Sequence, residues 1–384
     1  MKIVFASNFY NHHQKPLSDV LYSMTEVEYY FIETEPISEE RLKMGWGGDQ
    51  RPSYILQTYT DEAARIKCQQ IIDEADVVIY GSAPYSMMQT RLKNGRLTFA
   101  YSERPYKKGV PYVKLPVHIL RALKKYTRYK NFYMLCASAY TSADFSKMLA
   151  FKGKTYKWGY FPTVKRYENI DEIIGWKHPA SILWVARLIG LKHPEIPVMV
   201  AKRLKADGYD FKLNIIGNGE LENATRELIE REKVADCVEM LGSMKPEEVR
   251  EYMEKSEIFM FTSDRNEGWG AVLNESMNSG CAVVANSTIG SVPFLINDGE
   301  NGYMYNDVDD LYNKVKLLLD NDDERKRIGK NAYKTMIEEW NAENAAEKFV
   351  ALCNKMLAGE YKPCPYESGV CSKAEILKDG WYIK

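Results

Sequence analysis

The chain has 384 residues, an apolar content of 45% and a formal net charge of -1 at pH 7. This length predicts two domains with enough apolar material for hydrophobic cores, and the near-neutral charge gives no reason to expect nucleic-acid binding. The seven cysteines are scattered and odd in number, which argues against a disulfide framework and indicates a reduced, intracellular protein.

The chain opens with MKIVFASNFY, whose apolar run is too short for a signal peptide. No segment approaches the roughly 20 apolar residues that a membrane-spanning helix needs. We therefore expect a cytoplasmic protein.

Short apolar runs rich in β-branched and aromatic residues alternate with helical patterns along most of the chain. The first series of expected strands is 2–7, 27–33, 76–82, 97–102 and 132–138, with helices such as 61–73 and 84–94 between them. The second series is 181–187, 212–217, 237–242, 258–263, 281–286 and 302–305. Strands joined by crossover helices predict parallel sheets covered on both faces, so the fold class is α/β with two doubly wound domains. Ligands should bind beyond the carboxyl ends of the strands.

A stretch without apolar periodicity separates the two series. Residues 161–180, FPTVKRYENIDEIIGWKHPA, contain two prolines and many charges, and we interpret them as the linker between domains at 1–165 and 180–345. Beyond residue 308 the chain is mostly helical. The tail carries Cys364 and Cys371 without nearby histidines, so we expect free thiols there rather than a zinc site.

One segment of the first domain is strongly basic. From Arg104 to Tyr167 the chain has 15 lysines and arginines and one acid, Asp144. Residues 115–130 read as a helix on which four cations share one side: Arg121, Lys124, Lys125 and Arg128. Such a helix either lies on an anionic membrane, through the segment 104–130, or presents an ordinary solvated face.

The second domain carries the most informative stretch, NEGWGAVLNE at 266–275. Glu267 falls in the loop after a strand, beside Gly268 and Gly270, which let the backbone approach a ligand closely. The following helix, closed by Gly280, offers its N-terminus to an anion, with Glu275 more than a turn along it. Two carboxylates around an anion site suggest a ligand built as sugar, phosphate, sugar.

Two further loops of this domain supply complementary groups. Arg187 and Lys192 lie in ARLIGLKH, just past the strand that begins at Ser181, and could neutralise a phosphate. The loop GNGE at 217–220 follows the next strand and could approach a ribose or a base. Each loop alone could equally be an ordinary solvated turn.

The stretch EGWGAVLNE, with seven residues between its glutamates, resembles the signature of the retaining glycosyltransferases of family 4. Four other segments resemble that family in the same order: VARLIGLKH, IIGNGE, VEMLGSMKPEEV and FLINDGENGYMY. The resemblance implies the GT-B fold, in which two Rossmann-like domains face each other across a cleft. Two positions depart from the family pattern: Ala186 replaces a usual glycine, and Phe294 replaces a frequent glutamate.

The resemblance also implies roles for individual residues. Arg187 and Lys192 would bind the donor diphosphate, Glu267 the hydroxyls of the transferred sugar and Glu275 the ribose. We expect catalysis to involve Glu267, Arg187, Lys192 and His13. The expected donor-binding residues are Gly268, Trp269, Gly270, Glu275, Gly217, Asn218, Gly219, Ser243 and Met244. For Trp269, simple core packing is the alternative.

The implied reaction is a hexosyl transfer with retention of anomeric configuration and without an established enzymic nucleophile. Cations and the helix N-terminus would stabilise the leaving diphosphate as its charge develops. The co-substrate is a nucleotide sugar, with uridine the favoured base, and no further cofactor or metal is expected. The Asp-x-Asp in NDVDDL (306–311) reads better as a helix N-cap than as a metal site.

By the same resemblance the first domain binds the acceptor, and the chain beyond about 345, to 384, crosses back onto it. Its loop SNFYNHHQKPLSD is bulky and polar, so we expect Asn11, His12 or His13 to contact donor phosphate or acceptor; an ordinary capping loop is the alternative. Glu103 and Arg104, in YSERP, are further acceptor candidates. GSAPYS (81–86) lacks a histidine that many relatives have near the donor sugar.

The opening YNHHQ resembles enzymes of bacterial capsular and exopolysaccharide synthesis. This suggests transfer to a saccharide or polyprenyl-linked saccharide at the inner face of the cell membrane. Three alternatives remain: a nucleotide-sugar epimerase or phosphorylase of the same shape, a non-catalytic nucleotide-sugar binder, and a dinucleotide oxidoreductase. The last lacks G-x-G-x-x-G after the strands at 2–7 and 181–187.

Overall fold

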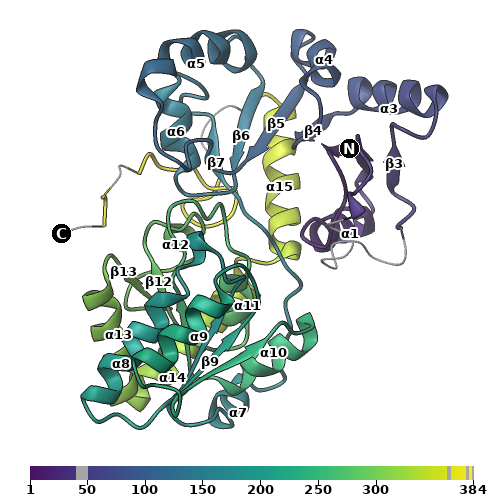
Figure 1. Cartoon of the computed structure of the whole chain (residues 1–384). Coiled ribbons are helices and arrows are strands. Elements are labelled where there is room, and N and C mark those ends of the chain that lie inside the picture. The colour runs from purple at the N-terminus through teal and green to yellow at the C-terminus, as the bar shows by residue number, and fades with distance from the viewer. Residues whose placement is uncertain (40–50, 361–364, 378–379, 383–384) are drawn as a thin grey trace. The chain divides into compact units, whose positions relative to one another are not determined.

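The chain folds into two units, each built around one parallel β-sheet (Figure 1). The computed structural model describes residues 1–39, 51–360, 365–377 and 380–382. Unit 1 comprises Met1–Thr163 and Asn341–Lys378, and unit 2 comprises Val164–Trp340 and Asp379–Lys384. The two parallel α/β domains expected from the alternating pattern are confirmed.

Unit 1 contains a seven-stranded sheet in the order β3-β2-β1-β4-β5-β6-β7. The strands are β1 (Lys2–Ser7), β2 (Glu28–Glu33), β3 (Ile55–Gln57), β4 (Val77–Tyr80), β5 (Leu97–Ser102), β6 (Phe132–Cys136) and β7 (Thr155–Lys157). Its helical elements are α1 (Lys15–Ser23), α3 (Glu62–Glu74), η1 (Tyr85–Met88), α4 (Gln89–Lys93), η2 (Tyr112–Lys114), α5 (Leu115–Ala122), η3 (Leu123–Thr127), α6 (Thr141–Lys147) and α15 (Ala342–Leu357). β1 and β4 are neighbours in the sheet, and the strands that follow each of them along the chain are added in opposite directions. This reversal places a crevice beyond the carboxyl ends of β1 and β4.

Unit 2 contains a six-stranded sheet in the order β10-β9-β8-β11-β12-β13. The strands are β8 (Ser181–Val185), β9 (Lys212–Ile216), β10 (Val238–Gly242), β11 (Ile258–Phe261), β12 (Ala282–Asn286) and β13 (Tyr303–Tyr305). The helical elements are α7 (Ile170–Gly175), η4 (Gly190–Lys192), α8 (Glu195–Ala206), α9 (Glu222–Arg231), α10 (Pro246–Lys255), α11 (Val272–Asn278), α12 (Val292–Leu295), α13 (Val308–Asp320) and α14 (Asp322–Glu338). The order reverses at β8 and β11, so the loops after these two strands should flank a ligand.

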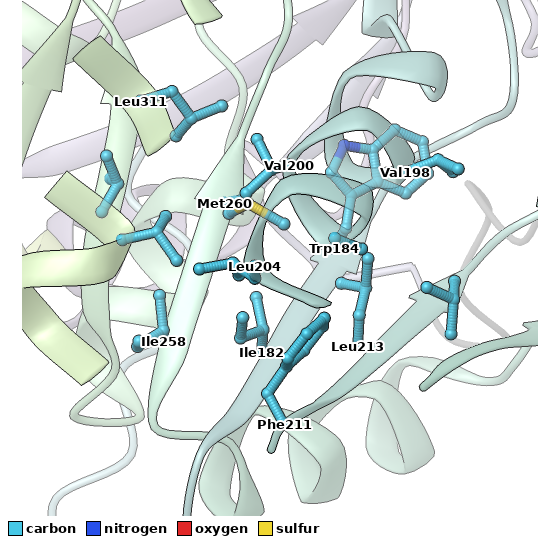
Figure 2. Packing of buried hydrophobic residues seen from close by; sticks show 14 of the residues in the cluster. Ile182, Trp184, Val198, Val200, Leu204, Phe211, Leu213, Ile258, Met260 and Leu311 are labelled. Carbon is cyan, nitrogen blue, oxygen red and sulfur yellow. The ribbon is translucent and has the colours of Figure 1, made fainter. Parts of the chain in front are cut away.

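The core of unit 2 lies between its sheet and the covering helices (Figure 2). Ile182 and Trp184 of β8 and Met260 of β11 face apolar side chains such as Val198 and Leu204 of α8. Continuous apolar runs form these strands because a parallel sheet is buried on both faces. This packing fixes the carboxyl ends of β8 and β11, from which the candidate site extends.

Several expected elements differ from those observed. The presumed linker 161–180 contains α7, and residues from Val164 onward belong to unit 2. The three-residue strands β3 and β7 were not expected. The helix expected at 115–130 is α5 followed by the π-helical turn η3. Asp307, by contrast, caps α13 as expected, accepting a 2.8 Å hydrogen bond from Asp310 N.

The π-helical turn corrects the expectation that four cations share one side. It advances more residues per turn than an α-helix, so the side chains after Ala122 fall out of phase with α5. Lys125 Nζ lies 4.7 Å from the centroid of the Tyr85 ring, and the Arg128 guanidinium lies 4.8 Å from that of Tyr129. Arg121, Lys124 and Arg128 are exposed, and Lys125 is half-buried.

The C-terminal region divides between the units. Helix α15 packs against α1 in unit 1, and the segment after it adds an antiparallel bridge to β7, between Tyr156 and Lys373. Cys371 there is buried, whereas Cys364 lies outside the described residues. Tyr382 instead donates a 2.6 Å hydrogen bond to Asp298 of unit 2. Among the described helices, none is long and apolar enough to cross a membrane.

Candidate active site

The loop after β8 carries the two cations expected to bind phosphate. Lys192 closes the short helix η4, and its Nζ forms an ion pair with Glu267 Oε2 of the loop after β11. Both side chains are mostly buried, at 13% and 15% exposure. Arg187 is exposed, and its guanidinium makes no hydrogen bond or ion pair with any residue the structure describes. The fold therefore brings Lys192 and Glu267 into contact, and it leaves Arg187, in the same loop as Lys192, without a polar partner among the described residues.

The turn that carries Lys192 is fixed to the end of β11. Thr262 Oγ1 accepts a 2.8 Å hydrogen bond from the Trp184 indole and donates a 2.7 Å bond to Lys192 O. The Asp264 N–H donates to Leu191 O at 3.0 Å. Because the loops after β8 and β11 are bonded in this way, the relative position of Lys192 and Glu267 is preorganised. Neither Thr262 nor Trp184 was predicted from the sequence, since neither forms part of a polar motif.

The loop that carries Glu267 requires glycine at one position. Gly270 has φ +83°, and a Cβ there would lie 2.3 Å from the Phe261 ring and 3.3 Å from Glu267 Cγ. The Glu267 N–H donates to Asp264 O at 3.0 Å, and the Asp264 carboxylate accepts the Asn266 N–H at 2.8 Å. These bonds hold the Glu267 backbone in one conformation. A larger residue at 270 would displace the Glu267 side chain.

Trp269 packs in the core of unit 2. Its indole is buried, donates to Asn274 Oδ1 at 2.9 Å and lies 5.9 Å from the Trp340 ring, centroid to centroid. This arrangement supports the core-packing alternative for the side chain. A donor contact from Trp269 would have to come from its backbone.

Glu275 lies in the first turn of α11, not beyond it as expected. The helix has only seven residues, so we assign no anion site to its N-terminus. Burial raises the pKa of the Glu275 carboxyl, and nearby Arg250 lowers it in part. Arg250 itself donates to Glu275 O and Asn278 Oδ1 at 3.0 and 3.1 Å. Within the described residues the Glu275 carboxylate accepts no hydrogen bond, so it can take a ligand hydroxyl.

The glycine-rich loop after β9 packs tightly against the loop after β8. A Cβ at Gly217 would lie 1.9 Å from Ala186 O, and one at Gly219 would lie 2.4 Å from Leu188 O. Asn218 contributes its carbonyl, which accepts the Leu188 N–H at 2.8 Å. These glycines are therefore needed for contact between loops. Beyond β10, Ser243 is exposed and Met244 half-buried.

In unit 1 the loop after β1 is a capping structure that also presents histidines. Asn11 is buried, and its Oδ1 accepts the His13 N–H at 2.9 Å, in agreement with the capping alternative. The His13 ring stacks on the Tyr160 ring, and the centroids of the His12 and His13 rings lie 3.9 Å apart. Burial, with a smaller contribution from His12, lowers the pKa of His13 to about 3. His13 is therefore neutral at pH 7 and can act there as a hydrogen-bonding group but not as a cation.

Tyr160 connects this loop to the one after β5. Its hydroxyl donates a 2.6 Å hydrogen bond to Glu103 Oε1, while Lys107 holds the other oxygen at 2.5 Å. The structure thus joins His13 and Glu103 through a residue that the sequence did not single out. The signal was weak because Tyr160 follows the unexpected strand β7.

Arg104 is placed differently from the expectation of an acceptor contact. Its guanidinium is buried and forms two 3.2 Å hydrogen bonds with the carboxylate of Asp144. The Tyr106 N–H donates to the same carboxylate at 3.0 Å. Arg104 therefore holds the loop after β5 against α6, and this placement favours a structural role.

Comparison with known proteins defines the fold and the region that carries the site. The family model described as "Glycosyl transferases group 1" matches residues 167–335, which lie in unit 2. The Erwinia amylovora protein "Amylovoran biosynthesis glycosyltransferase AmsK" is 32% identical over 131 residues, which cover 33% of this chain and 32% of the relative. The chain thus matches about a third of that relative's length.

Two solved structures extend the likeness to both units. Anabaena HepE in complex with UDP aligns with a TM-score of 0.68 and 14% identity, covering 92% of this chain and all of that one. Sucrose-phosphate synthase from Thermosynechococcus elongatus aligns with a TM-score of 0.63 and 14% identity, covering 94% and 100%. The two parallel-sheet units therefore have the GT-B fold. Within that fold, the part of the chain that matches the group 1 model, residues 167–335, lies in unit 2.

Proposed function

We propose that the protein is a retaining glycosyltransferase that moves a hexose from a UDP-sugar to a saccharide or lipid-linked saccharide in cell-surface polysaccharide synthesis. One observation carries this proposal. Arg187, without a polar partner among the described residues, and the Lys192–Glu267 ion pair lie in the loops after β8 and β11, the neighbouring strands at which the strand order reverses, within the part of the chain that matches the group 1 glycosyltransferase model. Two cations and a carboxylate there match the groups of a sugar diphosphate.

The donor would bind across the loops of unit 2. Arg187 and Lys192 would hold the diphosphate and stabilise its charge as the bond to the sugar breaks. Glu267, released in part from Lys192, would accept hydroxyls of the transferred sugar, and backbone N–H groups of Gly268–Gly270 would assist. Glu275 would bind the ribose, because its carboxylate has no other partner among the described residues.

The chemistry we propose needs no metal or further cofactor, because Arg187 and Lys192 can supply the positive charge that the leaving group requires. We assign no enzymic nucleophile. Uridine is supported by the neighbours: HepE is described in complex with UDP and with UDP-glucose. Polysaccharide synthesis is supported by the amylovoran relative.

For the acceptor we propose the cluster of His12, His13, Tyr160 and Glu103 in unit 1. Its rings offer stacking surfaces for a sugar, and Glu103 offers a carboxylate for hydroxyls. Neutral His13 can donate or accept without bringing a charge that the donor phosphate would bind. This cluster lies at the carboxyl ends of β1, β5 and β7, as a ligand site in a parallel sheet should.

Thermal unfolding with UDP, GDP, ADP and NAD at millimolar concentration tests the donor class. A ligand at 100 times its dissociation constant stabilises by about 2.7 kcal/mol, enough to raise Tm by several degrees. We expect a shift with UDP, followed by turnover in a screen of UDP-sugars. A shift with NAD alone would support an oxidoreductase, and UDP binding without turnover would support a non-catalytic binder.

The substitution Arg187→Ala tests the mechanism. A charge-assisted contact is worth roughly 1.5–3 kcal/mol, so turnover should fall about 10- to 100-fold or more. Because Arg187 is exposed and makes no polar contact with described residues, Tm without ligand should not change. Arg231→Ala, at another exposed arginine of unit 2, is the matched control. A rate within twofold of wild type for Arg187→Ala would refute the assignment.

A further inference from the structure

Large apolar side chains are concentrated on one exposed segment of unit 1. Of the thirteen exposed large hydrophobic residues in the described chain, five fall between Tyr112 and Leu123. Tyr112, Val113 and Leu120 are 76%, 96% and 61% exposed. An isolated exposed apolar residue is ordinary, but a cluster of this kind marks an interaction surface.

Helical geometry places these side chains together. The segment runs through η2 into α5, and Val113, Val117 and Leu120 are spaced by four and three residues, which puts them on one face. The opposite face, with His118, Ile119 and the buried Ala122, is turned toward unit 1; His118 Nδ1 lies 2.9 Å from the Tyr106 hydroxyl. Helix α5 is therefore apolar on its inner and its outer side.

The segment that carries the apolar face is rich in cations and contains no acids. Residues 105–130 contain eight lysines and arginines and not one aspartate or glutamate. Lys114, Arg121 and Lys124 are exposed beside the apolar face and form no ion pair with any residue in the described ranges. A surface that is apolar at its centre and cationic at its rim is complementary to an anionic lipid surface.

We propose that residues 112–124 form a membrane-docking surface. Val113, Val117 and Leu120 enter the boundary between headgroups and acyl chains of an anionic bilayer, and Lys114, Arg121 and Lys124 contact lipid phosphates. An isologous contact with a second copy is disfavoured, because it would bring the same cations face to face. The surface belongs to unit 1 and the proposed donor-binding residues belong to unit 2, so vesicle binding can be measured independently of transferase activity.

Co-sedimentation of the full chain with phosphatidylglycerol-rich vesicles tests this proposal. We expect binding at low salt and little binding to phosphatidylcholine vesicles. Each cation near the surface contributes about fivefold in affinity, so Arg121→Gln with Lys124→Gln should weaken binding about 30-fold. The isocharge control, Lys67→Gln with Lys93→Gln, removes two exposed lysines elsewhere in unit 1 and should change binding less than twofold. Equal losses of vesicle affinity in the two double variants would show that binding does not depend on a local surface around residues 112–124.

The apolar contribution is tested separately. Val113→Asn with Leu120→Asn keeps the net charge and should reduce vesicle binding at least tenfold, whereas Ile66→Asn with Leu149→Asn, at exposed apolar positions outside the surface, should not. In Leu120→Trp, tryptophan emission should shift to the blue with anionic vesicles and be quenched by brominated lipid. Absence of vesicle binding would overturn the proposal. Self-association of the protein that is abolished in Val113→Asn with Leu120→Asn would also overturn it, and would show that the surface binds a second copy of the chain.

Discussion

The ion pair between Lys192 and Glu267 gives each residue a different expected effect on binding and turnover. Without ligand, each side chain compensates the charge of the other in a mostly buried position. In the proposed site, Lys192 binds the diphosphate whereas Glu267 binds the sugar. Loss of the Glu267 charge should therefore free Lys192 for the nucleotide while removing a contact to the reacting group.

Glu267→Gln should accordingly lower kcat about 100-fold without weakening UDP binding, because a charge-assisted contact to the sugar is worth roughly 1.5–3 kcal/mol. Isothermal titration with UDP and a turnover assay with the UDP-sugar measure the two effects. Asn266→Ala, in the same loop, controls for general disturbance of its backbone. A tenfold loss of UDP affinity in Glu267→Gln would place this carboxylate on the nucleotide instead.

His193, next to Lys192, provides a pH-dependent link between two loops. Its imidazole contacts Glu195 at 2.7 Å and Asp264 at 3.4 Å, and its backbone has φ +52°. Burial alone would lower the pKa of His193, but these two carboxylates outweigh it and raise the pKa above its ordinary 6.5. The stabilisation is therefore complete below pH 6.5 and is lost as pH rises through the folded-state pKa.

The variant His193→Asn tests this link, since asparagine tolerates the left-handed backbone but cannot carry the charge. The Tm of wild type should exceed that of the variant most at pH 5.5, and the difference should shrink toward pH 8.5. Comparison at each pH cancels the titration of all other groups. A difference that grows with pH would show that His193 acts in its neutral form.

At the scale of elements, one buried lysine joins the ends of two helices. Lys177 Nζ donates to Met253 O and Ser256 O at the end of α10, both at 2.9 Å, and to Ser279 O just after α11, also at 2.9 Å. Burial lowers the pKa of this ammonium group. A cation is favourable at helix C-termini because the last carbonyls there lack partners within the helix. Lys177 thus holds in place the helix that carries Glu275.

Lys177→Met should destabilise unit 2 by about 2–4 kcal/mol, since it leaves several buried carbonyls without this donor. Urea denaturation monitored by circular dichroism measures the change. Lys212→Met is the matched control: Lys212 is exposed and, among the residues that the structure describes, forms an ion pair with the exposed Glu239 alone, so the expected cost is below about 0.5 kcal/mol. Equal midpoints for the two variants would show that the hydrogen bonds of Lys177 to these carbonyls add nothing.

The sequence predicts long elements better than short ones. IFMF of β11 is recognisable because a strand buried on both faces is a continuous apolar run. The strands ILQ and TYK, β3 and β7, are too short to show any period, and α7 is hidden among charges and prolines. The π-helical turn is accompanied by contacts of Lys125 with Tyr85 and of Arg128 with Tyr129, and helix propensity does not predict such tertiary contacts.

The candidate site shows the same limit. Lys192 and Glu267 could be placed together because the carboxyl ends of parallel strands share one edge of a sheet. Thr262 and Trp184 could not be found, because their bond forms between strands far apart in sequence. Arg104 was expected to contact the acceptor because it follows an expected strand. Its partner Asp144 lies 40 residues away and pairs with it only in the fold, so the sequence could not show the pair.

For the whole molecule, the path of the chain makes the two units unequal. Unit 2 is nearly continuous, from Val164 to Trp340. Unit 1 depends on a distant segment: Phe349 of α15 packs against Phe99 and Trp158, with ring centroids 5.1 and 5.4 Å away. Beyond α15, the Cys371 N–H donates to Lys157 O at 2.9 Å, covering the edge of β7. Unit 1 can therefore complete its core only after the C-terminal region is present.

This asymmetry predicts opposite outcomes for two fragments. The fragment 164–340 retains all six strands of its sheet and should unfold cooperatively by calorimetry, with a higher Tm in the presence of UDP. The fragment 1–340 lacks α15, whose buried Phe349, Val350 and Leu352 each contribute roughly 1.5–3 kcal/mol. Their loss is comparable to the 5–15 kcal/mol that stabilises a typical domain. Calorimetry of 1–340 should therefore show only the transition of 164–340, and a second transition would contradict the dependence of unit 1 on α15.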